Sequence, residues 1–151
     1  MTMRFSYQRM LVARPLASLP GRTDRPRPYV TVTILGPTGI AIDKALLDTG
    51  ADDTVFPEWL ALKIGIDLSN APWGTCGGMG GGSGLLRFAQ VTLRIADNKE
   101  RREWRAWVGF TTAPLPHSLL GYAGFLQYFT ATFHGDREEV ELTVNGQYPG
   151  T

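Results

Sequence analysis

Few residues in this sequence could form disulfides or bind a transition metal. The 151 residues include one cysteine, Cys76, and two histidines, His117 and His134. A single cysteine excludes an intrachain disulfide, which fits a reducing compartment, so we expect a cytoplasmic location. His134 and Asp136 lie close together in the sequence, but no third ligand stands at a suitable spacing. We therefore expect neither a metal nor another cofactor.

The sequence also lacks a charge excess and a long apolar run. Lys and Arg number 15 against 14 Asp and Glu, a net charge of +1 with both signs mixed, so we expect no nucleic-acid partner. No apolar run approaches the roughly 18 residues of a membrane span, so we expect no membrane partner. The length suits one domain, and 18 glycines with 10 prolines favour a turn-rich β protein.

Basic residues gather at the N-terminus. Residues 1–27 contain six arginines and one aspartate, so we divide the chain into a basic N-terminal arm, 1–27, and a folded domain, 28–151. The arm has some features of a transit peptide, but its apolar segment 10–13 is short and ends at Arg14. A surface arm is the better interpretation, and residues 5–7 within it are able to join a sheet.

Alternating apolar and polar residues predict strands through most of the domain. The predicted strands are 29–35, 40–47, 85–96, 103–110, 130–134 and 139–144. Turns join them as three successive antiparallel hairpins. A short helix is predicted over 57–63, because Pro57 suits the first helical position and Gly65 stands just past the end.

The most specific stretch is 46–55, which reads Leu-Leu-Asp-Thr-Gly-Ala-Asp-Asp-Thr-Val. Asp-Thr-Gly alone is a weak signal, but the ten-residue run is far more specific. A second feature is the glycine-rich tract 74–84, which matches none of the phosphate-binding spacings. Taken alone, this tract is either a flexible loop or a segment in conformations that only glycine tolerates.

The run 46–55 resembles the active-site loop of the retroviral-type aspartic proteases, the retropepsins. The resemblance implies an all-β fold: a closed, barrel-like lobe with a glycine-rich flap hairpin and one or two short helices. Leu119-Leu120-Gly121 resembles the second hallmark of this family, an apolar-apolar-Gly strand that passes beside the catalytic loop in a ψ-shaped arrangement. Retroviral enzymes usually place an arginine next, paired with an acid, but Tyr122 stands there, so Asp52 or Asp53 needs another partner.

An aspartic protease needs two carboxylates that share one proton and hold one water. Asp-Thr-Gly occurs once in this chain, so the second carboxylate must come from another copy, and a two-fold dimer brings Asp48 to Asp48. The resemblance therefore implies a homodimeric aspartic endopeptidase that hydrolyses peptide bonds. In it Asp48 binds the attacking water, Thr49 locks the two loops together, and the Gly50 amide supports the carboxylates.

The resemblance also implies a peptide or protein substrate and the residues that bind it. The expected substrate-binding residues are Ala51, Asp52 and Asp53 after the catalytic triplet, and Gly78, Met79, Gly80 and Gly81 in the flap. Asp52 and Asp53 have a plainer alternative as surface carboxylates that cap a turn.

Other functions remain open at this stage. The same fold could serve as a non-catalytic binding or scaffold module, or the enzyme could mainly process its own arginine-rich arm. A serine hydrolase has little support, because His117 and Ser118 are adjacent and Ser83 lacks the second glycine of a nucleophile elbow.

Overall fold

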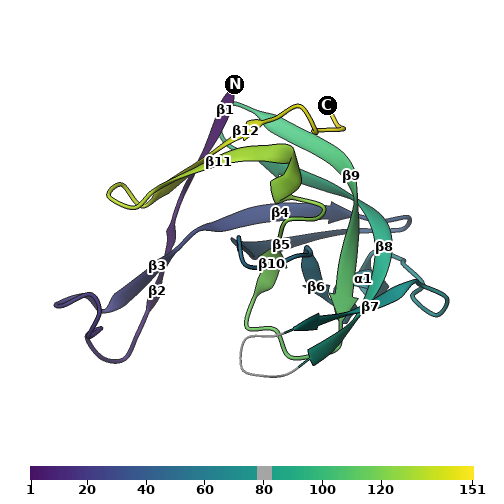
Figure 1. Ribbon diagram of the computed structural model, residues 1–151, viewed down its shortest axis with the longest axis horizontal. Helices are drawn as coiled ribbons and strands as arrows, with labels where there is room; N and C mark the ends of the chain where they lie inside the picture. Colours follow the sequence, from purple (N-terminus) through teal and green to yellow (C-terminus); the bar gives the residue numbers. More distant parts are fainter. Residues whose placement is uncertain (78–82) are drawn as a thin grey trace.

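The computed structural model describes residues 1–77 and 83–151, which form an almost entirely β structure (Figure 1). The strands are β1 (Thr2–Ser6), β2 (Gln8–Leu11), β3 (Asp24–Arg27), β4 (Tyr29–Leu35), β5 (Ile40–Leu47), β6 (Val55–Pro57), β7 (Trp73–Gly77), β8 (Ser83–Ala96), β9 (Arg101–Thr111), β10 (Ser118–Leu120), β11 (Phe129–His134) and β12 (Glu139–Val144). The helical segments are α1 (Glu58–Lys63) and the 3-10 turn η1 (Leu126–Tyr128). No helix in these two ranges is long and apolar enough to cross a membrane.

The largest sheet closes on itself. Its strand order is β4-β5-β10-β6-β9-β8-β7, and β4 pairs with β8 as well as with β5. This additional pairing joins the first strand of the order, β4, to the sixth, β8. The strands β4, β5, β10, β6, β9 and β8 therefore form a ring, and β7 lies outside it. Closure removes the free edges that an open sheet would leave. The predicted closed, barrel-like all-β lobe with short helices is therefore confirmed.

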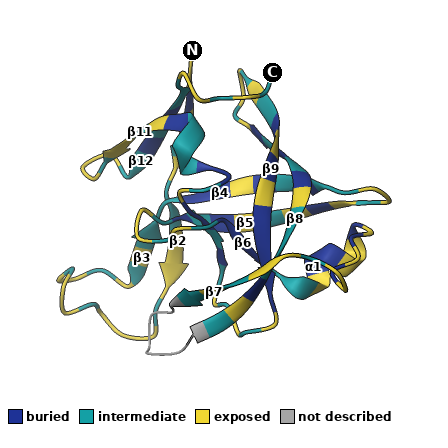
Figure 2. Ribbon diagram, turned by 45° about the vertical axis from the view of Figure 1, so that its right-hand side comes forward, coloured by how far each residue is buried: buried dark blue, intermediate teal, exposed yellow. Residues whose placement is uncertain are grey.

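Alternation along the strands builds the core of the ring. In β4, Val30, Val32 and Ile34 are fully buried, while Thr31 between them is exposed. Figure 2 shows the buried residues gathering where the strands of the barrel cross. Each buried aliphatic side chain contributes about 1.5–3 kcal/mol relative to exposure, so this alternation fixes which face of each strand points inward.

The predicted strands match the structure closely, and the helix start does not. Three of the ranges, 29–35, 40–47 and 139–144, coincide with β4, β5 and β12. Pro57 was expected as the first helical residue, but its φ of −66° and ψ of 145° are extended, so the expectation is wrong by one residue. Pro57 instead ends β6, where it pairs with Thr111 of β9, and the helix begins at Glu58.

The first 27 residues form two different structures. β1 pairs with β12 in a three-stranded sheet, β1-β12-β11, and Met3 is buried in the core. The expectation that part of the arm joins a sheet is thus confirmed. β2 and β3 form a separate two-stranded sheet, and this hairpin projects from the barrel (Figures 1 and 2). The division into an arm, 1–27, and a domain, 28–151, stays a prediction.

Candidate active site

Asp48 stands at the point where β5 ends and a loop to β6 begins. β10 runs parallel to β5, with Leu120 opposite Leu47, and antiparallel to β6, with Leu119 opposite Val55. It therefore passes between the two strands that flank the Asp48 loop. This is the ψ-shaped arrangement predicted from the sequence, and the structure confirms it.

Backbone hydrogen bonds fasten the Asp48 loop to the segment that follows β10. The Asp48 amide donates to the Leu120 carbonyl (3.1 Å), and the Tyr122 amide donates to the Ala51 carbonyl (2.9 Å). The Ala123 amide donates to the Asp52 carbonyl (2.9 Å). These bonds hold the start and the middle of the loop. They join backbone groups, so they do not depend on which side chains the loop carries.

The Asp48 carboxylate is oriented by its own loop. The Gly50 amide donates to Asp48 Oδ1 at 2.9 Å, and the Ala51 amide donates to the Asp48 carbonyl at 3.1 Å. A Cβ on residue 50 would lie 3.3 Å from the same Oδ1, a crowded distance that glycine avoids. Asp48 is partly buried, whereas Thr49 and Gly50 are exposed. The triplet therefore presents one ordered carboxylate at the protein surface.

Two glycines after β10 allow the close approach of the two segments. A Cβ on Gly121 would overlap the Asp53 carbonyl oxygen and lie 2.7 Å from the Ala51 carbonyl oxygen. Gly124 has a φ of +88°, and a Cβ there would lie 2.8 Å from the Trp107 carbonyl oxygen. The glycine of the apolar-apolar-Gly motif is thus required by contact with the Asp48 loop. Gly124 was missed by the sequence analysis, although its spacing of three from Gly121 was a visible signal.

Thr54 is a second residue that the sequence analysis passed over. Its side chain is fully buried, and its Oγ1 donates to the Ala123 carbonyl at 2.8 Å. Its own carbonyl accepts a bond from the Gly109 amide at 2.8 Å, which ties the end of the loop to β9. The only sequence signal for this role was the place of the threonine, between the acidic pair at 52 and 53 and the apolar Val55.

Asp52 and Asp53 differ in their surroundings. The Asp52 side chain is exposed, whereas Asp53 is partly buried beside Ala123. Burial raises the pKa of Asp53, and the neighbouring Asp52 charge raises it further. Among the described residues no cationic group lies within 4.0 Å of either carboxylate. Tyr122, where the retroviral enzymes carry arginine, is 63 % exposed and supplies no charge.

The described parts of the glycine-rich tract that was predicted to form a flap, 74–77 and 83–84, lie in β7 and β8. These strands pair antiparallel from Trp73 opposite Arg87 to Gly77 opposite Ser83. The predicted flap residues Gly78, Met79, Gly80 and Gly81 lie outside the described residues, so their role stays a prediction. The substrate-binding role of Ala51 stays a prediction as well, together with those of Asp52 and Asp53.

The weaker candidates from the sequence have other contacts. His117 Nε2 lies 3.4 Å from Arg27 Nη1, whereas the Ser118 hydroxyl donates to the Asp43 carboxylate. The adjacent pair therefore points to different partners and does not form a serine–histidine couple. His134 lies 3.6 Å from Glu141. Over residues 1–77 and 83–151, no group of three or more His, Cys, Asp or Glu is placed to hold a metal ion.

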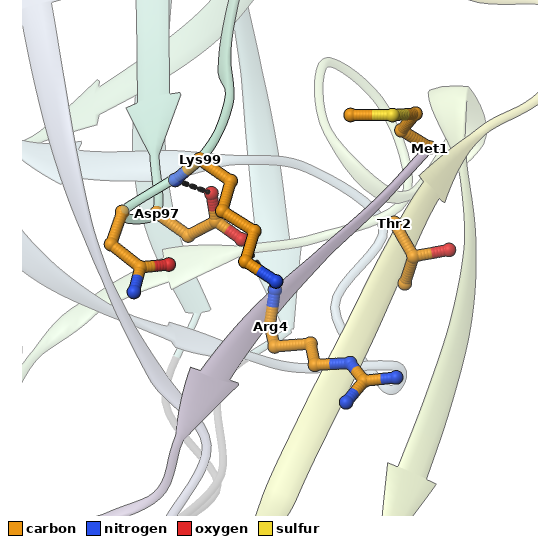
Figure 3. A pocket seen from close by; sticks show the side chains of 6 residues that line it. Met1, Thr2, Arg4, Asp97 and Lys99 are labelled. Carbon is orange, nitrogen blue, oxygen red and sulfur yellow. Dashed lines mark hydrogen bonds between the residues drawn. The ribbon is translucent and has the colours of Figure 1, made fainter.

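Two surface cavities lie away from Asp48. One of about 670 Å³ is lined by Met1, Thr2, Arg4, Asp97, Asn98 and Lys99 (Figure 3). Within it the Asp97 carboxylate accepts bonds from the backbone amides of Arg4 (3.1 Å) and Lys99 (2.8 Å). A smaller cavity of about 300 Å³ lies at the base of the β7–β8 hairpin. The Asp48-Thr49-Gly50 triplet borders neither cavity.

Comparison with known proteins supports the fold. A solved retropepsin-like aspartic protease from Rickettsia conorii is 20 % identical, with 94 % of this chain and 92 % of that chain covered and a TM-score of 0.54. The EIAV protease in complex with the inhibitor HBY-793 is 22 % identical, with 63 % of this chain and 81 % of that chain covered and a TM-score of 0.42. No protein-family model and no curated protein sequence matches the chain. This chain has the fold of the retropepsin-like aspartic proteases.

Proposed function

We propose that this protein is an aspartic endopeptidase whose active site is assembled from two copies of the chain, each supplying one Asp48. The observation that carries the proposal is the position of Asp48. Its main chain is fastened to Leu120, and its carboxylate accepts a hydrogen bond from the Gly50 amide. A catalytic carboxylate must be held in one position, and this arrangement meets that requirement.

The reaction divides its two proton transfers between the two copies of Asp48. Two carboxylates in contact cannot both be ionised, so one keeps a proton. The ionised Asp48 takes a proton from a bound water as the water oxygen attacks the scissile carbonyl carbon. The protonated Asp48 gives its proton to the carbonyl oxygen. The Asp48 that took the water's proton then gives it to the amide nitrogen. As the tetrahedral diol collapses, the C–N bond breaks and one diol hydroxyl returns its proton to the other Asp48, which restores the starting state of the pair.

The second carboxylate has no source within one chain. Asp-Thr-Gly occurs once, and within the described part of the chain the only hydrogen bond to the Asp48 carboxylate comes from the Gly50 amide. A two-fold axis beside the exposed Thr49 would bring the two triplets together. Thr49, with a hydroxyl that donates and accepts, would then link the two loops.

The substrate in this proposal is an extended peptide that lies across both loops under the β7–β8 hairpins. The carbonyls of Ala51 and Asp52 already accept bonds from Tyr122 and Ala123. The exposed side chain of Asp52 is one group of this loop that remains available to the peptide. The predicted flap residues would close over the peptide and exclude water.

The direct test is the Asp48→Asn variant. We expect cleavage of a peptide library to fall at least about 1,000-fold, because both proton transfers use this carboxylate, while circular dichroism stays unchanged. Asp136→Asn, in the exposed β11–β12 turn, is the matched control and should cleave normally. An active Asp48→Asn variant would rule the mechanism out.

A mixing experiment tests whether the site is shared. In an equal mixture of wild-type and Asp48→Asn chains after subunit exchange, about one quarter of the dimers carry two Asp48 carboxylates. We expect activity per total chain to fall to that fraction. A fall to one half would place a complete site in each chain.

A statine-type transition-state mimic tests the alternative of a non-catalytic scaffold module. The mimic should bind if two Asp48 carboxylates are assembled into a pair, and it should not bind a module without such a pair.

A further inference from the structure

The hairpin of β2 and β3, residues 8–27, stands apart from the rest of the fold. Its strands pair only with each other among the described residues, from Gln8 opposite Arg27 to Leu11 opposite Asp24. It projects from the barrel in both views (Figures 1 and 2). Leu11 is 86 % exposed at the far end of β2. An isolated two-stranded hairpin is marginally stable in water, so this one needs support from other groups. We call it the ribbon.

Ion pairs give the ribbon a fixed direction. Glu138, in the β11–β12 turn, lies 2.5 Å from Arg22 Nη1 and 3.1 Å from Arg9 Nη2. Arg22 also pairs with Asp24 at 2.7 Å. Glu138 has a φ of +51°, and its carbonyl accepts a bond from the Tyr7 amide at 2.7 Å. These contacts hold the ribbon in one orientation relative to the body of the protein.

The base of the ribbon lies next to the Asp48 loop. We call this loop the half-site, because each copy of the chain would supply one half of the proposed active site. The Leu47 amide, one residue before Asp48, donates to the Pro28 carbonyl at 3.1 Å. The Tyr29 hydroxyl donates to Met10 Sδ at 3.4 Å, and its ring packs edge-on against His117 at the start of β10. The ribbon therefore leaves the barrel where β5 ends and β10 begins, which is where a second copy must lie if Asp48 is to meet Asp48.

The charges of the ribbon and of the half-site are complementary. Arg14 and Arg25 are exposed, and no acidic group of the described residues lies within 4.0 Å of either one. Asp52 and Asp53, beside Asp48, likewise lack a cation. A two-fold dimer that joins the two Asp48 loops would place a partner copy beside the base of each ribbon, where unpaired arginines on one chain can approach unpaired carboxylates on the other. Such complementarity sets the register of an interface.

We propose that the ribbon is the arm with which each copy of this chain holds the second copy, a proposal that rests on the two-chain active site proposed above. Leu11 supplies apolar contact at the far end of the arm, and Arg14 and Arg25 supply charge. The network around Glu138 fixes the direction from which the arm reaches the partner. The position of the ribbon favours a second copy of the chain as its partner, because the base of the ribbon lies beside the half-site.

The test compares exposed ribbon residues with equally exposed residues elsewhere. Leu11→Glu and the double variant Arg14→Glu/Arg25→Glu alter the ribbon. Leu62→Glu, at a position 73 % exposed on α1, and Arg101→Glu, at an exposed position in β9, are the matched controls. Sedimentation equilibrium of each full-length chain over a range of concentrations gives the dimer dissociation constant. We expect it to rise at least about tenfold for both ribbon variants, equivalent to about 1.4 kcal/mol, and to stay unchanged for both controls.

A second measurement separates this proposal from the proposed function. The ribbon does not touch the reacting atoms, so the ribbon variants should regain wild-type cleavage per dimer at concentrations above their new dissociation constants. Dissociation constants equal to that of the wild type would overturn the ribbon proposal, even if Asp48→Asn is inactive. A ribbon-dependent dimer that cleaves no peptide would support the arm and reject the endopeptidase. A chain that stays monomeric at every concentration would overturn both.

Discussion

The Asp48 loop and the ribbon lie side by side but are held in opposite ways. Backbone hydrogen bonds fasten the loop, from the Asp48 amide to the Leu120 carbonyl and from the Tyr122 amide to the Ala51 carbonyl. The ribbon is fastened to the body mainly by ion pairs between arginines and Glu138. Main-chain bonds in a packed setting tolerate little displacement, whereas exposed ion pairs are weak and sensitive to salt. The Asp48 loop is therefore held by bonds that salt does not weaken, whereas the orientation of the ribbon depends on ion pairs that salt does weaken.

Among variants that test how firmly the loop is held, we expect Gly121→Ala to lose the most stability. The added methyl would overlap the Asp53 carbonyl oxygen and lie 2.7 Å from that of Ala51. Separating the two segments should lower the free energy of unfolding by about 3 kcal/mol. Urea denaturation measures it. Gly146→Ala is the control, since a Cβ there meets nothing within 4 Å, and it should change stability by less than about 0.5 kcal/mol. Equal stabilities would show that the segments are not tightly packed.

A smaller effect is expected from Thr54→Val, which keeps the shape and removes the hydroxyl that donates to the Ala123 carbonyl. Losing this buried bond should cost about 1 kcal/mol, because the carbonyl still accepts from the Thr54 amide. Thr31→Val, on the exposed side of β4, is the control. Hydrogen exchange at the Tyr122 and Ala123 amides should rise in the Thr54 variant only. Unchanged exchange would mean that the backbone bonds alone hold the loop.

Sequence patterns predicted the regular part of this molecule well. The strands β4 and β5 were predicted to the residue, because each alternates apolar and polar side chains between a core and a solvent face. The Asp48 loop and Leu119-Leu120-Gly121 were found because their residue types are dictated by contacts: Gly121 by the backbone that it touches and Asp48 by the chemistry that it would perform.

The remainder depended on tertiary contacts that no local pattern records. β2 and β3 were not predicted as a pair, since arginines and Pro26 obscure any alternation, and ion pairs to Glu138, more than 100 residues away, hold them. Thr54 and Gly124 escaped notice because their roles arise only where the loop meets the segment after β10. Pro57 was misplaced because its pairing with Thr111 extends β6 by one residue.

A still smaller effect is expected from Asp53→Asn at the edge of the half-site. Burial and the Asp52 charge raise the pKa of Asp53 above its ordinary value. The group therefore favours folding most below its ordinary pKa, and this contribution is lost as the pH rises through the raised value. We expect Asp53→Asn to have a higher Tm than the wild type near pH 7 and no advantage near pH 3. Asp136→Asn, in an exposed turn, is the control, and an equal gain there would reject the explanation.

The smallest effect is expected from Glu138→Gln in the network that holds the ribbon. Hydrogen bonds and charge from Arg22, and then from Arg9, hold the pKa of Glu138 below its ordinary value despite some burial. A lowered pKa means that the contribution to stability is present above the ordinary glutamate value and is lost as the pH falls through the lowered one. We therefore expect the variant to have a slightly lower Tm at pH 7 and the same Tm as the wild type in strong acid.

High salt should shrink the Tm difference at pH 7 by screening the ion pairs. Glu139→Gln, which removes a single pair with Arg137 at 3.6 Å, is the neighbouring control and should have less effect. A Tm difference that persists in acid and in salt would mean that the left-handed backbone of Glu138 and its bond from Tyr7, rather than its charge, set the direction of the ribbon.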